Sequence, residues 1–276
     1  MVDATGRGSR LSDWLEQGGW PRPELERLQV DVRYVSARFK RADDWTGPQN
    51  GICRYSPFFP SEGLACAAVN GIENQQWTVM LAHFGPPAGD FLARCRELPP
   101  VFQEAVSGEQ VGEVVPYRHP DSRWRHFEAL DRFPARLVVV GDAVASFNPV
   151  YGQGMSSAAL HASCLSEYLR SGDLDTRHFF ALQKVIVEAA WQMSTAGDAA
   201  RLGLATPSAT EPERRHAWAL QQVRAAAGRD VAVGTAFRAV GFMTAHPASL
   251  FAPDLVHRAA RLNDVPEEQI RHEFPG

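Results

Sequence analysis

The stretch at residues 137–162, LVVVGDAVASFNPVYGQGMSSAALHA, decides the fold class. It opens with the apolar run 137–140, which is typical of a strand buried on both faces of a parallel sheet. Gly141 allows a sharp turn, and Asp142 then lies at the carboxyl end of the strand, the edge at which ligands bind in open α/β sheets. A helix is predicted over about 153–170, directly after the loop that follows.

That loop carries Pro149, and the glycines Gly152 and Gly154 come just before the helix. Glycines let a ligand approach the backbone closely, and a helix N-terminus offers unpaired N–H groups with about half a positive charge. One carboxylate for hydroxyl groups and one dipole end for an anion therefore lie close together in the sequence. The structural alternative is that Asp142 caps a turn that the glycines merely permit, but turn chemistry does not account for the whole string.

The residues that carry a family resemblance are Gly141-Asp142-Ala143, Pro149, Gly152-Gln153-Gly154-Met155 and Ala158. They resemble the second flavin fingerprint of FAD-dependent aromatic-ring hydroxylases, the group A flavoprotein monooxygenases. Relatives of that group include squalene-epoxidase-like enzymes, geranylgeranyl-reductase-like enzymes and flavin halogenases. The resemblance implies that Asp142 binds the flavin ribitol chain, that Pro149, Gly152 and Gly154 lie against the isoalloxazine ring, and that the helix dipole favours the anionic reduced flavin. It also implies that Gly141, Gln153 and Met155 belong to the same cofactor-binding segment.

The N-terminal string Asp3-Ala4-Thr5-Gly6-Arg7-Gly8-Ser9-Arg10 resembles the family's middle motif, in which a strand ends in Asp-Gly-x-x-Ser. Gly6 and Ser9 are its candidate cofactor-binding residues. Thr5 stands where many hydroxylases have Asp, and an Asp-Ala-Ser/Thr-Gly variant is familiar among reductase-like, epoxidase-like and halogenase-like members. Because of this departure, NAD(P)H is retained only as a candidate reductant beside FAD.

The segment between the two motifs alternates polar and apolar residues with period two. Strands are predicted over 28–41, 52–56, 64–70, 76–84 and 111–119, with turn residues such as Asn70-Gly71 between them. Helices are predicted over 10–17, 90–98, 100–106, 176–193, 212–227, 231–244, 253–261 and 266–272.

We therefore expect an α/β (α+β) chain with a truncated FAD/NAD(P)-binding fold, an antiparallel substrate-binding sheet and a helical C-terminal part. The expected division is a remnant of the FAD-binding domain over 1–27, the sheet domain over 28–135, the Gly-Asp motif with its helix over 136–172, and a helical region over 173–276. No GxGxxG occurs in the 276 residues, so the unit that cradles the FAD pyrophosphate in this family is not encoded here. The chain is expected to be the C-terminal two-thirds of the enzyme, colourless and prone to associate when purified alone.

The function implied by the resemblance is that of an FAD-dependent monooxygenase, which hydroxylates or epoxidises a hydrophobic or aromatic small molecule through a flavin hydroperoxide. A geranylgeranyl-reductase-like FAD-dependent reductase and a non-catalytic binding module stay open as alternatives. No catalytic residue is assigned. A metal site is not expected, because HExxH and Cys/His ligand pairs are missing. Gly154-Met155-Ser156 lies too far beyond its strand for the nucleophile elbow of a hydrolase.

Composition restricts the partners and the compartment. The net charge of -4 and the pI near 6.1 give no general attraction for nucleic acid, and membrane contact by the apolar C-terminal segment is not favoured. The four cysteines form no CxxC pair, which favours reduced thiols and a cytoplasmic protein. His83 and His161 are expected to be structural. An aromatic set on the sheet fits either a substrate cavity or a core: Tyr55, Phe58, Phe59, Trp77 and Phe84.

Overall fold

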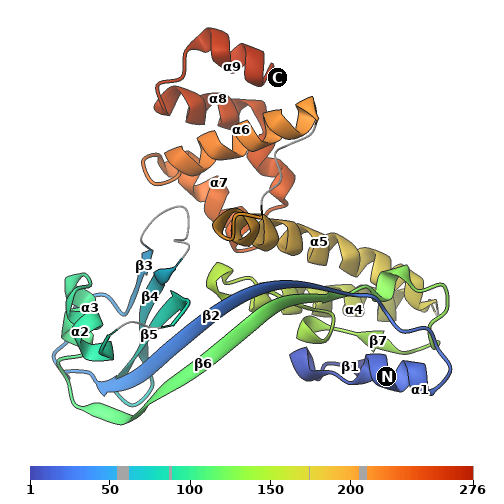
Figure 1. The fold of residues 1–276 in the computed structure, drawn as a ribbon, viewed down its shortest axis with the longest axis horizontal. Helices are drawn as coiled ribbons and strands as arrows, with labels where there is room; N and C mark the ends of the chain where they lie inside the picture. The colour runs from blue at the N-terminus through green and yellow to red at the C-terminus, as the bar shows by residue number, and fades with distance from the viewer. Residues whose placement is uncertain (55–61, 87–88, 174, 205–209, 276) are drawn as a thin grey trace. The chain divides into compact units, whose positions relative to one another are not determined.

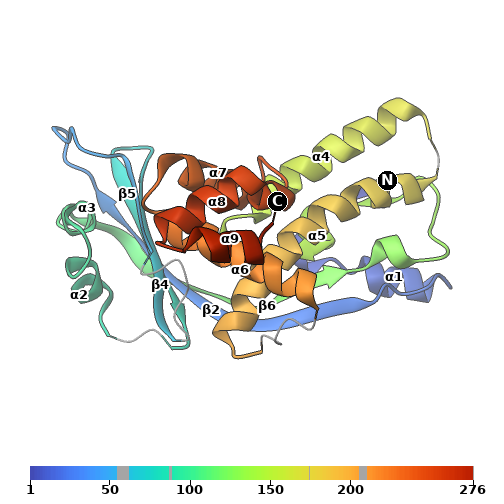
Figure 2. The same ribbon diagram turned by 90° about the horizontal axis from the view of Figure 1, so that it is seen from above.

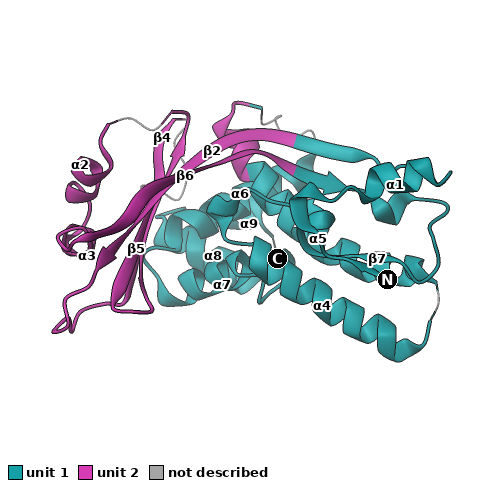
Figure 3. Cartoon of the chain, turned by 90° about the horizontal axis from the view of Figure 1, so that it is seen from below, with its two compact units in different colours: residues 1–27, 123–196, 204–276 teal, residues 28–122, 197–203 magenta. Residues whose placement is uncertain are grey.

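The computed structural model describes residues 1–54, 62–86, 89–173, 175–204 and 210–275, and the chain divides into two compact units (Figure 3). Unit 1 combines residues 1–27, 123–196 and 204–276, and unit 2 combines residues 28–122 and 197–203. The strands are β1 Val2–Asp3, β2 Leu25–Lys40, β3 Asn50–Arg54, β4 Gly63–Ile72, β5 Gln76–Phe84, β6 Gln110–Arg125, β7 Val138–Val139 and β8 Ala145–Ser146 (Figure 1). The α-helices are α1 Leu11–Gln17, α2 Phe91–Arg96, α3 Pro100–Ala105, α4 Gly154–Ser171, α5 Thr176–Arg201, α6 Glu211–Ala226, α7 Val231–Gly241, α8 Pro253–Leu262 and α9 Glu267–Glu273.

The predicted fold class is confirmed, since a mixed α/β chain carries an antiparallel sheet and ends in helices. One sheet has six strands in the order β3-β4-β5-β2-β6-β8, and a second pairs β1 with β7 in parallel. The β3–β4, β4–β5 and β2–β5 ladders are all antiparallel, as the turn residues between the strands predict.

Unit 2 builds its core on one face of β2, β4 and β5. Helices α2 and α3 contribute Cys95 and Phe102 to that core, and Leu98 joins it from the turn between them. Trp77 belongs to it and is buried, and Phe84 is buried with the Arg201 guanidinium 3.7 Å from its ring centroid. These two aromatic residues are therefore packing residues, while Tyr55, Phe58 and Phe59 lie outside the described residues.

Strand β2 changes its buried face along its length, which simple alternation does not predict. Val30, Val32 and Tyr34 are buried in its first half, whereas Ala37 and Phe39 are buried in its second half. The two sets have opposite parity and thus lie on opposite faces of the strand. The second set belongs to the core of unit 2.

Strand β7 is much shorter than the predicted strand over 137–140. Only Val138 and Val139 pair with β1. Leu137 and Val140 are partly buried and pack against the core of unit 1, which explains why the whole run is apolar. Aromatic side chains from β6, η2 (Phe127–Ala129) and α5 dominate that core, among them Trp124, Phe127, Phe179 and Trp191.

Helices α6, α7 and α8 form a second apolar cluster within unit 1, around Val223, Val233 and Val256. Thr210 caps α6: its hydroxyl accepts from the Glu213 N–H, and the Glu213 carboxylate accepts from the Thr210 N–H. Helix α5 runs eight residues beyond the predicted end at 193, and within it the Ser194 and Thr195 hydroxyls donate to the Trp191 carbonyl one turn back. In the described part of the chain, every helix is too short or too polar to traverse a lipid bilayer.

The capping box at α6 gives a direct stability test. Thr210→Ala removes the side-chain acceptor for the first turn, so we expect the free energy of unfolding to fall by about 1 kcal/mol in urea denaturation followed by circular dichroism. Thr235→Ala is the matched control, because Thr235 is exposed in the interior of α7 and alanine is the better helix former there. Equal effects of the two substitutions would contradict the role of the cap.

Candidate functional site

The two sequence motifs meet within unit 1 because their strands are paired in parallel. Val2 lies opposite Val138, and Asp3 lies opposite Val139. The turn η1 (Gly6–Gly8) follows β1 and the turn η3 (Gly141–Ala143) follows β7, so both turns begin at one sheet edge and pack together. Residues separated by more than 130 positions in the sequence therefore share one site.

The N-terminal turn is organised around the buried carboxylate of Asp3. Its Oδ1 accepts from the Thr5 N–H at 2.9 Å and the Thr5 hydroxyl at 2.6 Å, and its Oδ2 accepts from the Ser9 hydroxyl at 2.5 Å. Burial alone raises the pKa of Asp3, but these hydrogen bonds and the charge of Arg125 outweigh it and hold the pKa below its usual value. The hydroxyl of Ser9, a predicted cofactor-binding residue, thus donates its hydrogen bond within the turn itself.

Arg125 joins the two turns, and nothing in the sequence singles it out. It lies at the end of β6 and is buried; its guanidinium donates to the carbonyl of Ala143 and to that of Arg7, both at 3.0 Å. The Arg7 guanidinium donates to the Ser146 hydroxyl at 3.2 Å, which in turn donates to the Asp142 carboxylate at 3.2 Å. The carboxylate of Asp142 is thereby oriented by a side chain four residues further on.

His161 fixes the end of β7 to helix α4. Its Nδ1 accepts from the Gly141 N–H at 2.9 Å, so the neutral ring carries its proton on Nε2. The side chain is fully buried, and this burial lowers its pKa to about 4 from the ordinary 6.5. The prediction that His161 is structural is confirmed by this bond.

The loop before α4 is shaped by local hydrogen bonds. The Asn148 side chain accepts from the Val150 N–H at 3.1 Å and starts the short helix η4 (Pro149–Tyr151), which ends at Gly152 with φ +74°. Pro149, Gly152 and Met155 are exposed, whereas Gln153 is buried and its Nε2 lies 3.1 Å from the Met193 sulfur. The exposed members of the predicted set therefore flank Gln153, whose side chain points into the protein.

Two glycines of the site have no conformational or packing reason of their own. Gly6, Gly141 and Gly152 have positive φ values, a backbone that favours glycine. Gly8 and Gly154 do not, and within the described part of the chain a Cβ at either would meet no atom within 4 Å. Gly154 moreover begins α4, where alanine is the better helix former. A group outside the chain that approaches this backbone would account for both.

The sequence was compared with protein-family models and with curated proteins. No protein-family model matches the chain. "Protein Rv3254" of Mycobacterium tuberculosis (strain ATCC 25618 / H37Rv) is 34% identical over 213 residues, which cover 72% of this chain and 44% of that protein. The chain thus spans less than half the length of this curated relative.

Solved structures share the fold at low sequence identity. A flavoprotein/dehydrogenase from Cytophaga hutchinsonii matches 95% of this chain and 61% of its own with a TM-score of 0.58 and 13% identity. The p-nitrophenol 4-monooxygenase of Pseudomonas putida DLL-E4 matches 87% of this chain and 59% of its own with a TM-score of 0.50 and 19% identity. A flavin-dependent brominase variant matches 95% of this chain and 62% of its own with a TM-score of 0.50 and 12% identity. The chain therefore has the fold of a large part of these flavin-dependent proteins.

The Asp3 cluster predicts an acid-sensitive contribution to stability. Asp3→Asn leaves the donors of Thr5 and Ser9 facing a neutral amide, so we expect the free energy of unfolding at pH 7 to fall by about 1–3 kcal/mol in urea. The carboxylate has a depressed pKa when folded, so its contribution is present above a pH of about 4 and is lost as the pH falls through the folded value. The loss caused by the substitution should shrink accordingly in acid. The exposed Asp131→Asn is the control, and a loss in that control as large as in Asp3→Asn would contradict the assignment.

His161 predicts a second pH dependence, in a different range. The unfolded ring binds its proton more tightly than the buried ring, so stability should decrease as the pH drops from about 6.5 towards 4. His161→Leu should lower the free energy of unfolding at pH 7 by about 1–3 kcal/mol, since the Gly141 N–H loses its acceptor, and should flatten this pH dependence. The exposed His272→Leu should leave the profile unchanged. An unaltered profile in His161→Leu would count against the buried neutral ring.

Proposed function

We propose that the protein is a flavin-dependent oxidoreductase, and most specifically a monooxygenase that hydroxylates or epoxidises a hydrophobic or aromatic small molecule. The observation that carries the proposal is the pair of turns at the end of β1 and β7, with Gly8 and Gly154 beside open space and Asp142 held by Ser146. The shared fold of flavin-dependent proteins supports it. The reduced thiols of Cys66, Cys95 and Cys164 agree with a cytoplasmic setting.

The residues of the site fit the polyol and ring portions of a flavin. Asp142 is half-buried, and its carboxylate can accept hydrogen bonds from ribityl hydroxyls. Pro149 and Gly152 are exposed directly before the N-terminus of the 18-residue helix α4, whose dipole places partial positive charge there. A Cβ at Gly6, in the other turn, would also meet no atom of the described chain within 4 Å.

A bound flavin supplies two-electron redox chemistry and the activation of O₂, which protein side chains do not supply. This chain would contribute binding and orientation. Asp142 would orient the polyol, and the α4 dipole would stabilise negative charge at the ring. Arg125 and His161 hold the two turns in register.

Two alternatives lead to different observations. A flavin-dependent reductase would oxidise NAD(P)H and reduce its substrate without O₂ uptake, whereas a monooxygenase couples NAD(P)H oxidation to O₂ uptake in the presence of its substrate. A non-catalytic module would bind no flavin. An oxygen electrode combined with flavin titration separates the three.

The nature of the flavin contacts gives the first test. The 276 residues contain no GxGxxG loop for the pyrophosphate, so Asp142 and the glycine turns would contact only the ring and the ribityl chain. We expect this chain to quench the fluorescence of FAD, FMN and riboflavin when it is titrated into each, with dissociation constants that agree within about threefold. A failure of all three to bind would overturn the proposed function, and a strong preference for FAD would show that the chain itself holds the adenosine diphosphate part.

Asp142→Ala should weaken flavin binding about tenfold or more, because a hydrogen bond to a charged group contributes about 1.5–3 kcal/mol. Asp131→Ala is the control, since Asp131 is exposed in the same unit. Equal flavin affinity of the Asp142→Ala variant and the native chain would remove Asp142 from the site.

Gly154→Ala should change stability and binding in opposite directions. Alanine at the start of α4 should raise the free energy of unfolding by up to about 1 kcal/mol, because a Cβ meets no atom of the chain there. The same Cβ should weaken flavin binding if the cofactor lies against this backbone. Gly228→Ala is the matched control, because Gly228 also borders open space without a positive φ but lies between α6 and α7. Loss of affinity in both variants, or in neither, would contradict the placement of the cofactor.

A further inference from the structure

Four arginines of unit 1 lie close together although they come from three parts of the sequence. Arg7 belongs to η1, Arg27 lies near the start of β2, and Arg123 and Arg125 lie at the end of β6. We call these four residues the arginine cluster. Strands β2 and β6 are neighbours in the six-stranded sheet and run side by side (Figure 2). The Arg125 guanidinium donates to the Arg7 carbonyl at 3.0 Å, so the end of β6 lies against η1.

Arg27 and Arg123 lie directly opposite each other on antiparallel strands. One backbone bond joins the end of β2 to the residue before β6, and at the other end the His126 N–H, directly after β6, donates to the Glu24 carbonyl, directly before β2, at 3.0 Å. Two residues joined in this way are opposite each other in an antiparallel pair. Counting three residues inward from each end of this bond reaches Arg27 on β2 and Arg123 on β6. Like charges in this arrangement destabilise a sheet.

The charges of the cluster act on one another. Arg125 follows Arg123 by two residues and therefore lies on the same face of β6. Arg125 is buried, and burial lowers the pKa of its guanidinium most, followed by the positive charges of Arg123 and Arg7. The carboxylate of Asp3 raises this pKa by less than either of those two arginines lowers it, and Arg27 lowers it further. Positive charge thus dominates around the buried guanidinium.

The outer members of the cluster can be reached from solvent. Arg27 is exposed, and Arg7 and Arg123 are half-buried. The Arg7 guanidinium donates to the Ser146 hydroxyl at 3.2 Å, and Ser146 on β8 is the cross-strand partner of Arg123, so both arginines approach the same residue. A guanidinium has five N–H donors, and a bond to one group of the chain leaves others that can face an anion.

We propose that the arginine cluster is a binding site for a phosphate group, which the guanidinium groups of Arg7, Arg27 and Arg123 contact while Arg125 supplies a buried positive charge behind them. Planar guanidinium groups match the geometry of phosphate oxygens and form paired hydrogen bonds with them. A doubly charged anion between the arginines would also replace their mutual repulsion by attraction. The ligand is a phosphate monoester, either a simple ester or a nucleotide.

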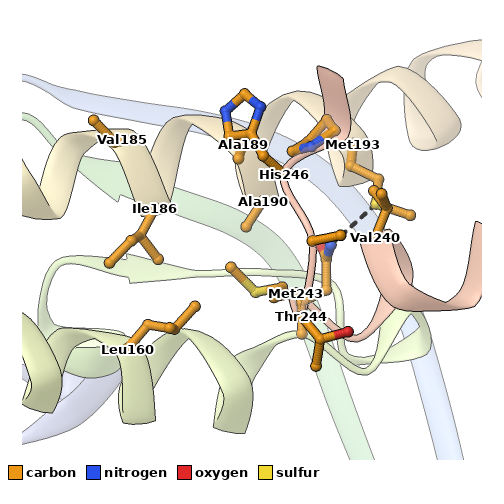
Figure 4. Close-up of a pocket in the computed structure, with 13 residues that line it drawn as sticks. Leu160, Val185, Ile186, Ala189, Ala190, Met193, Val240, Met243, Thr244 and His246 are labelled. Atoms are coloured by element: carbon orange, nitrogen blue, oxygen red, sulfur yellow. Dashed lines mark hydrogen bonds between the residues drawn. The ribbon is translucent and has the colours of Figure 1, made fainter. Parts of the chain in front are cut away.

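The apolar pocket of unit 1 offers nothing to such an anion. It lies between α4, α5 and the end of α7, and Figure 4 shows apolar side chains such as Leu160, Ile186 and Val240 around it. No Lys or Arg is among the described residues that line it, and the Gln153 Nε2 donates to the Met193 sulfur, the contact drawn as a dashed line. The N-terminus of α4 does attract anions, so the test must separate it from the cluster.

The experiment uses the flavin-free 276-residue chain, so it does not depend on the proposed function. Inorganic phosphate, AMP and adenosine are the probes in calorimetric titrations at low ionic strength. We expect one phosphate per chain at saturation, with an affinity that falls as sodium chloride is added, because salt screens the attraction. Arg27→Gln should weaken phosphate binding about tenfold, as should Arg123→Gln. Arg271→Gln is the matched control: Arg271 is exposed on α9 in the same unit, and this variant should bind as the native chain does.

The probes also separate the two sources of the phosphate. Equal affinities for inorganic phosphate and AMP would assign the site to the phosphate alone. An affinity for AMP at least tenfold higher, together with competition by adenosine, would assign it to a nucleotide. The comparison of flavins described above is made in saturating phosphate, so that the phosphates of FMN and FAD do not report this site.

Urea unfolding gives a second readout. A ligand that binds only the folded chain stabilises it, so phosphate should raise the unfolding midpoint of the native chain and of Arg271→Gln, and raise that of Arg27→Gln much less. Sodium chloride at the same ionic strength should not reproduce this rise. Binding that does not saturate, an unchanged affinity in Arg27→Gln, an equal loss in Arg271→Gln, or an equal rise of the midpoint with chloride would each overturn the proposal.

Discussion

The hydrogen bond from the Gly141 N–H to the buried ring of His161 is the constraint on which the candidate site depends. It ties the turn after β7 to the second turn of α4, twenty residues away in the sequence. The other ties on α4 are the packing of Cys164, Leu165 and Tyr168 in the core of unit 1 and the short helix η4 before it. The bond requires a neutral ring, and burial provides one.

A second tie holds the other turn in place. Arg125 donates to two backbone carbonyls, one in each turn, and places a buried positive charge near Asp3. Burying a charged guanidinium costs free energy unless its N–H donors are paired. Both bonds of Arg125 use the planar geometry of the guanidinium, which lysine does not reproduce. The short parallel pair β1–β7 is therefore held together by bonds at its end as much as by its own ladder.

The sequence predicted the elements well wherever local chemistry decides them. The strands from 28 to 84 follow from period-two alternation and the Asn70-Gly71 turn, and the C-terminal helices follow from capping residues and prolines. It did not predict the length of β7, because apolar residues such as Leu137 and Val140 signal burial and not pairing. Nor did it predict the change of buried face in β2, of which only the second half joins the core of unit 2 through Ala37 and Phe39.

The site was predictable in part for a similar reason. Gly6, Gly141 and Asp142 were marked by turn chemistry and lie together, yet their roles towards a flavin stay predictions. Arg125 was missed because its partners are backbone carbonyls, which leave no trace in a sequence. Gln153 was expected to belong to the cofactor-binding segment, and its side chain is buried against Met193.

The position of Gln153 has a thermodynamic consequence. One residue gives its backbone to the glycine loop and its buried side chain to the contact with Met193 on α5. If binding at the loop displaces this side chain, then a change on α5 that displaces it alters affinity at the loop by the same free energy.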